Sequence, residues 1–177
     1  MDLLSDLAAF DGKQTDVLEA LAAKRAPGPA LTSELCAVAQ RDEARLPAAA
    51  TWLLKRFQEQ GHVYAEEETA GLLGLFGSVD PWEAKLHLLQ MLPGLVIPED
   101  RAPALWRLVK GEGFLQGPNK FVRAWSYNAL AVTTIFLACL SLALLGFIAP
   151  AASCGQQSPR VPWRRDRAPA SGRASVG

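Results

Sequence analysis

Apolar residues recur at every third or fourth position over most of this chain, and sustained two-residue alternation is absent. The first spacing places apolar side chains on one face of a helix, whereas alternation would indicate a strand. Ala, Leu, Glu, Lys and Arg, which favour helices, dominate the same region. We therefore expect an all-α fold. The expected helices cover roughly residues 2–10, 14–25, 31–41, 43–60, 65–76, 81–93, 99–110 and 119 onward.

The segment DPWEAKLHLLQML contains the clearest helix start. Asp80 can accept backbone hydrogen bonds as N-cap, Pro81 suits the first helical position, and Glu83 can complete a capping box. The apolar residues that follow cover a wide arc, which requires neighbouring helices on two sides. We expect the Trp82 ring to lie in that packed core. Asn119 is expected to cap the last helix.

Helix pairs recur along the body at a spacing of about 35 residues. Leucine-rich second helices end near Phe57, Leu92 and Leu130, and their outer partners begin near Leu31, Ala65 and Glu99. A helix pair at this spacing cannot bury its apolar face alone, so successive pairs must stack. The pattern predicts an α-solenoid of stacked helix hairpins.

Two of the second helices open with related motifs. VRAWSYNALA, residues 122–131, contains a Val-Arg pair followed by Ala129 and Leu130, and DPWEAKLHLLQML opens with Asp-Pro and has Lys85 where Arg would be usual. In these motifs the chain resembles the HEAT-type repeat family, in its divergent bacterial form, over about residues 30–131. The helix at 43–60 fits the repeat spacing without the motif.

The resemblance implies a structural role for three residues and no catalytic one. In this family such Asp and Arg residues bridge adjacent repeats, a role that would fall here to Asp80, Lys85 and Arg123. The family generally supplies curved surfaces that bind other macromolecules, so a protein partner is the expectation that follows.

Charge is distributed unevenly, although the formal net charge is zero. Residues 1–128 contain 13 Lys+Arg and 17 Asp+Glu, a net charge of −4, and residues 129–177 contain five Arg and one Asp, a net charge of +4. An acidic body argues against nucleic-acid binding through its overall field.

Five cations fall on the expected second helices, which line the concave face in the HEAT-type family. They form a candidate partner-binding face and are Lys55, Arg56, Lys85, Lys120 and Arg123. A HEAT-like nucleic-acid-binding or DNA-repair protein is the alternative hypothesis. That alternative requires these cations to form a basic groove, and binding with a steep salt dependence would support it.

The segment from Ala129 to Ala149 has a different character, because no charge occurs between residues 124 and 159. As a helix it would be about 31 Å long, close to the roughly 30 Å hydrocarbon core of a bilayer. We therefore expect a transmembrane helix at 129–149, after a helical repeat domain at 1–131. The Arg/Pro-rich segment 150–177 is expected to be disordered.

The N-terminal residues do not resemble a signal peptide, so we expect a cytoplasmic body held by a C-terminal anchor. The arginines after the span compete with this orientation, because positive flanks favour the cytoplasmic side. A further alternative is that the abrupt change near Val132 marks an interrupted or frame-shifted fragment of a longer soluble repeat protein.

Candidate chemistry is sparse along the sequence. Cys36, Cys139 and Cys154 have neither disulfide nor zinc-site spacing, and His62 and His87 lack the partners that a metal site would need. His87 is expected on the polar strip of its helix, and residues 66–68, all Glu, in a solvated first turn. We expect no enzyme activity and no cofactor. The sequence predicts a non-enzymatic protein-interaction scaffold that is tethered at its C-terminus.

Overall fold

The computed structural model describes the backbone of residues 3–43 and 45–144, and the side chains of the same residues except 132, 133 and 135–144. The predicted tail at 150–177 lies outside the described residues. Within them the chain forms eight α-helices and one short 3-10 helix, and no strand. The helices are α1 (Leu3–Ala8), α2 (Asp16–Lys24), α3 (Pro29–Ala39), α4 (Leu46–Glu59), α5 (Glu66–Leu75), α6 (Trp82–Met91), η1 (Leu92–Gly94), α7 (Ala102–Lys110) and α8 (Lys120–Leu144).

The all-α prediction is confirmed for this part of the chain, and each expected segment contains one α-helix. The helix boundaries differ by a few residues. The largest differences are at α4, which was expected from residue 43 and begins at Leu46, and at α7, which was expected from residue 99 and begins at Ala102 after the turn that follows Pro98.

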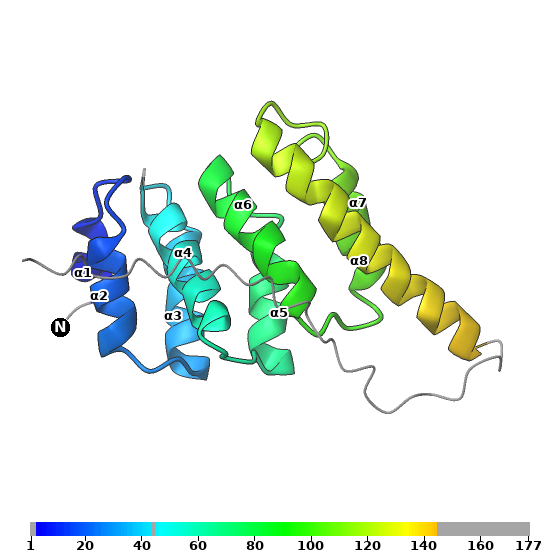
Figure 1. The fold of residues 1–177 in the computed structure, drawn as a ribbon, viewed down its shortest axis with the longest axis horizontal. Helices are drawn as coiled ribbons and strands as arrows, with labels where there is room; N and C mark the ends of the chain where they lie inside the picture. The colour runs from blue at the N-terminus through cyan, green and yellow to red at the C-terminus, as the bar shows by residue number, and fades with distance from the viewer. Residues whose placement is uncertain (1–2, 44, 145–177) are drawn as a thin grey trace, which may run out of the picture.

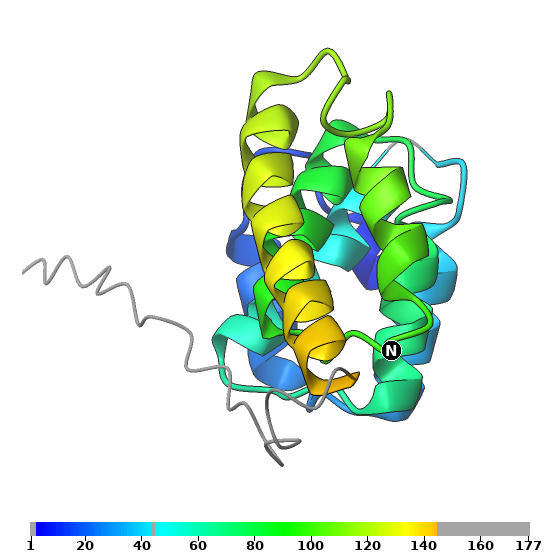
Figure 2. The same ribbon diagram turned by 90° about the vertical axis from the view of Figure 1, so that its right-hand side faces the viewer.

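The helices follow one another side by side along the molecule (Figure 1). α4, α6 and α8 form a row in which each helix packs against the next, and α3 packs against both α4 and α5. α7 pairs with α8, and Figure 2 shows the two helices on opposite sides of the molecule's end. α6 thus lies between α4 and α8, and we call the exposed side of these three helices the second-helix face.

A continuous core of Leu, Ala and aromatic residues joins the helices. Helix α4 illustrates how the sequence forms this core. Its residues Leu53, Leu54 and Phe57 lie on one side of the helix and are at most 2% exposed. Each such side chain contributes about 1.5–3 kcal/mol when it is removed from water. Packing of these faces, more than helix propensity, therefore stabilises the array.

Local sequence explains two helix ends. α4 ends in a Schellman motif: the Gly61 amide donates to the Gln58 carbonyl at 2.9 Å and the His62 amide to the Phe57 carbonyl at 3.0 Å. Gly61 has a φ of 100°, a left-handed conformation that glycine adopts without a Cβ penalty. At the start of α8, Asn119 caps the amides of Phe121 and Val122 through its side-chain oxygen, as predicted.

The cap predicted for α6 is wrong. The helix begins at Trp82, the preceding residue is Pro81, and no side-chain hydrogen bond caps the first turn. Because Pro81 adopts an extended backbone conformation, Asp80 lies one residue too early to cap the helix. Its carboxylate instead approaches the Lys85 ammonium at 3.7 Å.

α8 is the longest of the described helices, with 25 residues. Among the residues whose side chains the structure describes, no helix is both long and apolar enough to cross a membrane. The side chains of residues 135–144 and the whole of 145–149 lie outside that part. The transmembrane segment expected from Ala129 to Ala149 therefore stays a prediction.

Candidate interaction surface

The two cations of α4 are held by carboxylates. Lys55 Nζ lies 2.6 Å from Glu59 Oε1, and Arg56 Nε donates to Glu19 Oε2 of α2 at 3.0 Å. Arg56 also approaches the second oxygen of Glu59 at 3.6 Å. The side chains of Lys55 and Arg56 are only 16% and 33% exposed, so much of their charge is already compensated within the fold.

Lys85 of α6 reaches toward the loop between α7 and α8. Its ammonium lies 5.8 Å from the centre of the Phe114 ring in that loop and 3.7 Å from Asp80 Oδ1. Since Asp80 is fully exposed, this ion pair contributes little to stability. The contact with Phe114 connects consecutive helix pairs, while the ion pair with Asp80 is local.

The cations of α8 interact near the start of their own helix. Arg123 donates from Nη1 to the carbonyls of Gly117 and Pro118 at 2.9 and 2.8 Å, and Lys120 Nζ lies 5.1 Å from the centre of the Phe121 ring. The bridging of adjacent repeats by Asp80, Lys85 and Arg123 stays a prediction.

Exposed aromatic side chains are the more distinctive feature of the second-helix face. Trp82 is 42% exposed, so the expectation of a core position for its ring was wrong. The ring sits in the first turn of α6 and stacks against Phe121 of α8. The ring centroids are 6.4 Å apart at an interplanar angle of 27°, and Phe121 itself is 53% exposed.

Three further apolar residues, which are partly buried against the core, lie on the same row of helices as this stacked pair. Leu86 follows Trp82 by four residues and Trp125 follows Phe121 by four, so each pair occupies one face of its helix. The chain also places Trp52 beside Thr51, and Thr51 contacts α6 at His87. We call this set the aromatic strip, and its members are Trp52, Trp82, Leu86, Phe121 and Trp125.

The strip is partly open to water along its length. Leu86, Trp52 and Trp125 are half-buried against the core, and Trp82 and Phe121 are exposed. Rings of this kind bury a large area at low entropic cost when a partner covers them, which is why Trp is frequent among binding hot spots.

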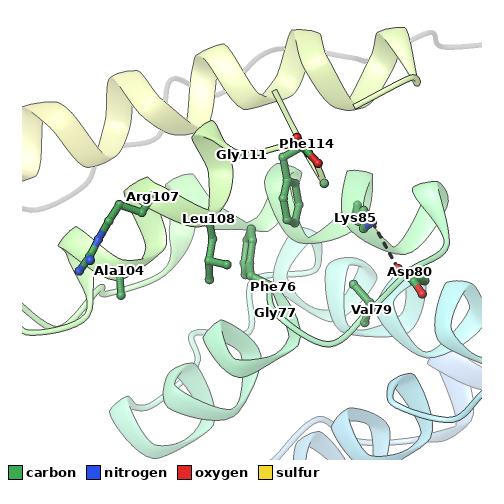
Figure 3. Close-up of a pocket in the computed structure, with 12 residues that line it drawn as sticks. Phe76, Gly77, Val79, Asp80, Lys85, Ala104, Arg107, Leu108, Gly111 and Phe114 are labelled. Atoms are coloured by element: carbon green, nitrogen blue, oxygen red, sulfur yellow. Dashed lines mark ion pairs between the residues drawn. The ribbon is translucent and has the colours of Figure 1, made fainter. Parts of the chain in front are cut away.

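A groove opens between the end of α5 and α7 (Figure 3). Its volume is ≈ 600 Å³ and its floor is the stacked pair Phe76 and Phe114, with centroids 5.6 Å apart. Leu108 lines one side, and the Lys85–Asp80 ion pair lies at the other end. Both signs of charge and apolar surface line this groove, so it favours no single class of ligand.

A buried carboxylate holds the loop between α4 and α5. Glu68 is 7% exposed, which corrects the expectation of a solvated turn for this residue. It accepts hydrogen bonds from the Thr32 hydroxyl at 2.7 Å and the Ala65 amide at 2.9 Å, and lies 3.5 Å from His62 Nε2. Burial alone would raise the pKa of Glu68, but the Ala65 amide, Thr32 and His62 lower it below its ordinary value. All three oppose protonation, so the cluster has a structural character.

His87, expected on the polar strip of its helix, is half-buried and lies where α6 contacts α4. Its Nδ1 is 3.1 Å from the Thr51 hydroxyl, and burial together with the Lys55 charge lowers the pKa of His87 to about 4. The ring is therefore neutral at neutral pH.

Nucleophilic and metal chemistry find little support in the described residues. Cys36 is buried, and its burial together with the charge of Glu68 raises the pKa of its thiol to about 11. Such a thiol stays protonated and unreactive at neutral pH. The part of the chain that the structure describes contains no group of three or more His, Cys, Asp or Glu residues that could hold a metal ion.

Neither a family model, nor a curated protein, nor a solved structure matches this chain.

Proposed function

We propose that this protein is a non-enzymatic interaction scaffold, an α-solenoid of HEAT-like helix pairs whose second-helix face binds a protein partner. The contact sequence α4–α6–α8 supports the stacking of successive pairs. The observation that carries the function is the stack of Trp82 on Phe121, because both rings are about half exposed and contribute little to the core of the chain itself.

A protein partner fits the surface better than a nucleic acid does. Of the five cations expected to form a basic face, Lys55, Arg56 and Lys85 each have a carboxylate partner in the fold. A nucleic acid would have to compete with those carboxylates for each cation. An aromatic strip with mixed charges at its edges instead matches the composition of protein interfaces.

The experiment is affinity capture with the full-length chain and three variants, followed by quantitative mass spectrometry. Trp82→Ser and Phe121→Ser each remove one exposed ring, and Val63→Ser removes an apolar side chain that is 76% exposed in the α4–α5 loop. We expect the same proteins to be lost by at least about tenfold with both ring variants and retained with Val63→Ser, since a hot-spot residue contributes about 2 kcal/mol or more.

Equal recovery with all four chains would contradict the proposed face. Capture of duplex DNA that weakens steeply between two salt concentrations, and that is unaffected by Trp82→Ser, would instead favour the nucleic-acid alternative.

We further propose that residues 129–149 tether the scaffold to a membrane. The sequence supports this with its uncharged run, and a charge near the middle of the span would oppose insertion. Full-length protein is expected to resist carbonate extraction, and the Ala143→Arg variant to be released. Ala124→Arg, an exposed position earlier on α8, is the matched control and should stay with the membrane. Release of all three chains alike would exclude the tether.

A further inference from the structure

Net charge changes sign along the array of helices. Residues 1–101 contain 9 Lys+Arg and 16 Asp+Glu, a net charge of −7, whereas residues 102–131 contain 4 Lys+Arg and 1 Glu, a net charge of +3. The second segment comprises α7, the loop after it and the first turns of α8, and we call it the basic end. It lies at the opposite end of the array from α1 and α2 (Figure 1). The acidic body therefore has a positive area that includes Phe121 of the exposed ring stack.

The two segments also differ in how their cations are held. Six of the nine cations of residues 1–101 have a nitrogen within 3.7 Å of an Asp or Glu oxygen, and these are Arg25, Arg41, Lys55, Arg56, Lys85 and Arg101. In the part of the chain whose side chains the structure describes, no ion pair involves a cation of the basic end. Those cations are Arg107, Lys110, Lys120 and Arg123.

Neutral groups orient the four cations of the basic end. Arg107 and Arg123 donate hydrogen bonds to main-chain carbonyls. The ammonium groups of Lys110 and Lys120 lie 4.7 and 5.1 Å from the centres of aromatic rings, and the ring beside Lys120 is Phe121. Carbonyls and aromatic rings attract a cation without cancelling its net charge. The basic end thus keeps a positive charge that a partner can meet.

We propose that the segment of the protein partner that covers the Trp82–Phe121 stack is acidic, with at least one carboxylate beside an apolar anchor residue. This proposal rests on the proposed function, because it identifies the chemistry of the partner at the same face. The apolar anchor covers the two rings, and the carboxylate reaches the exposed Lys120 ammonium next to Phe121. The positive end of the α8 dipole lies at the same turn and favours the same charge.

Carboxylates of the chain itself restrict where the acidic segment can lie. Glu83 follows Trp82 directly in the chain, and Asp80 is paired with Lys85. Negative charge on the partner is therefore disfavoured over the first turn of α6 and favoured over the start of α8. Glu112, in the loop before α8, is the one carboxylate of the basic end.

A nucleic acid fits this arrangement less well than a short acidic segment of a protein. Each nucleotide carries a phosphate charge, so a bound strand would extend from the basic end toward helices where the net charge is negative. A protein segment can confine its carboxylates to one helix pair.

Selection of short random displayed peptides on the immobilised full-length chain, in one mild detergent, tests the proposal with three variants. Lys120→Glu reverses the charge beside Phe121, and a carboxylate at the first position of α8 suits the helix dipole, so the fold is kept. Lys24→Glu is the matched control, because it reverses an exposed cation of α2 that belongs to none of the described ion pairs. Trp82→Ser reports on the proposed face itself.

We expect wild type and Lys24→Glu to select peptides that contain Asp or Glu next to an apolar residue. A synthetic peptide of this kind should bind Lys120→Glu about three- to tenfold more weakly than Lys24→Glu, because reversal replaces an exposed charge pair by repulsion. Its binding should weaken as salt is added. Trp82→Ser should weaken binding by at least about tenfold.

The outcomes separate the chemistry of the partner from the position of the face. Selected peptides that require Trp82 but show no excess of Asp and Glu, or that bind Lys120→Glu and Lys24→Glu equally, would overturn the acidic segment and leave the face intact. Selection that is indifferent to Trp82→Ser would contradict the face as well. A single-stranded DNA oligonucleotide that displaces the peptide, and whose own binding falls steeply with salt, would overturn the proposal in favour of a nucleic acid.

Discussion

Helix α6 is held differently on its two sides. Toward α4 the contact is polar, with His87 bonded to the hydroxyl of the fully buried Thr51. Toward α8 the first turn is joined by two aromatic rings, Trp82 and Phe121, that remain about half exposed. One helix therefore has a directional hydrogen bond on one side and a solvent-accessible apolar contact on the other.

The two contacts should therefore contribute differently, one to the stability of the fold and the other to the binding of a partner. A buried hydrogen bond is expensive to break, because the partner left behind loses its acceptor without gaining water. A ring that already faces water loses little when it is truncated and can gain much when a partner covers it. We therefore expect mutations on the α4 side to affect folding, and mutations on the α8 side to affect binding.

The largest loss of stability is expected for a residue of α6 that lies in the common core. Leu88 of α6 is 1% exposed, and Leu88→Ala should lower the free energy of unfolding by about 2–5 kcal/mol through lost burial and a cavity. Denaturant titration of the full-length chain measures this change. A loss below about 1 kcal/mol would contradict the position of Leu88 in a packed core.

The next largest loss of stability is expected at the contact between α4 and α6. The chain offers a matched pair of buried hydroxyls to test it. Thr51 and Ser126 are both fully buried, and each donates to the carbonyl four residues earlier. Among the described contacts of the two hydroxyls, only Thr51 also bonds to a residue of another helix, His87. Thr51→Val should cost about 1–3 kcal/mol, because Nδ1 of His87 loses its hydrogen-bond partner. Ser126→Ala should cost less than about 1 kcal/mol, since a bond back to the same helix adds little. Equal losses at neutral pH would show that the contact with His87 contributes nothing.

The exposed side should show the smallest change in stability. Trp82→Ala removes a ring stack worth about 0.5–1.5 kcal/mol, and thermal unfolding should shift by only a few degrees. A loss above about 3 kcal/mol would place the Trp82 ring in the core, as the sequence alone suggested.

The sequence predicts the helices well because their signal is local. Spacing of apolar residues and the Asn119 cap act within one or two turns, and both agree with the structure. Trp82 and Glu68 were misplaced because their environment depends on which neighbouring helix covers each face. The hydrogen bond between His87 and Thr51 joins residues 36 positions apart, so the local pattern around His87 could not predict it.

The aromatic strip could be predicted in part. The spacing of Phe121 and Trp125 indicates that they share one face of α8, but no local pattern predicts that the Phe121 ring stacks against the Trp82 ring. That contact depends on the stacking of α6 beside α8, a relation between segments about 40 residues apart. The partly compensated charges of Lys55 and Arg56 likewise depend on the side-chain geometry of α4 and, for Arg56, on the approach of Glu19 from α2.

The central claim, that the exposed rings of the second-helix face meet a protein partner, is tested most directly by site-specific photo-crosslinking in cells. A photoreactive phenylalanine analogue replaces Phe121 in one chain and Val63 in another, both of which are more than half exposed. We predict a discrete crosslinked protein at position 121 that is lost when Trp82→Ser is added, and no such product at position 63. The absence of a crosslink at 121, or the same products at both positions, would contradict the account.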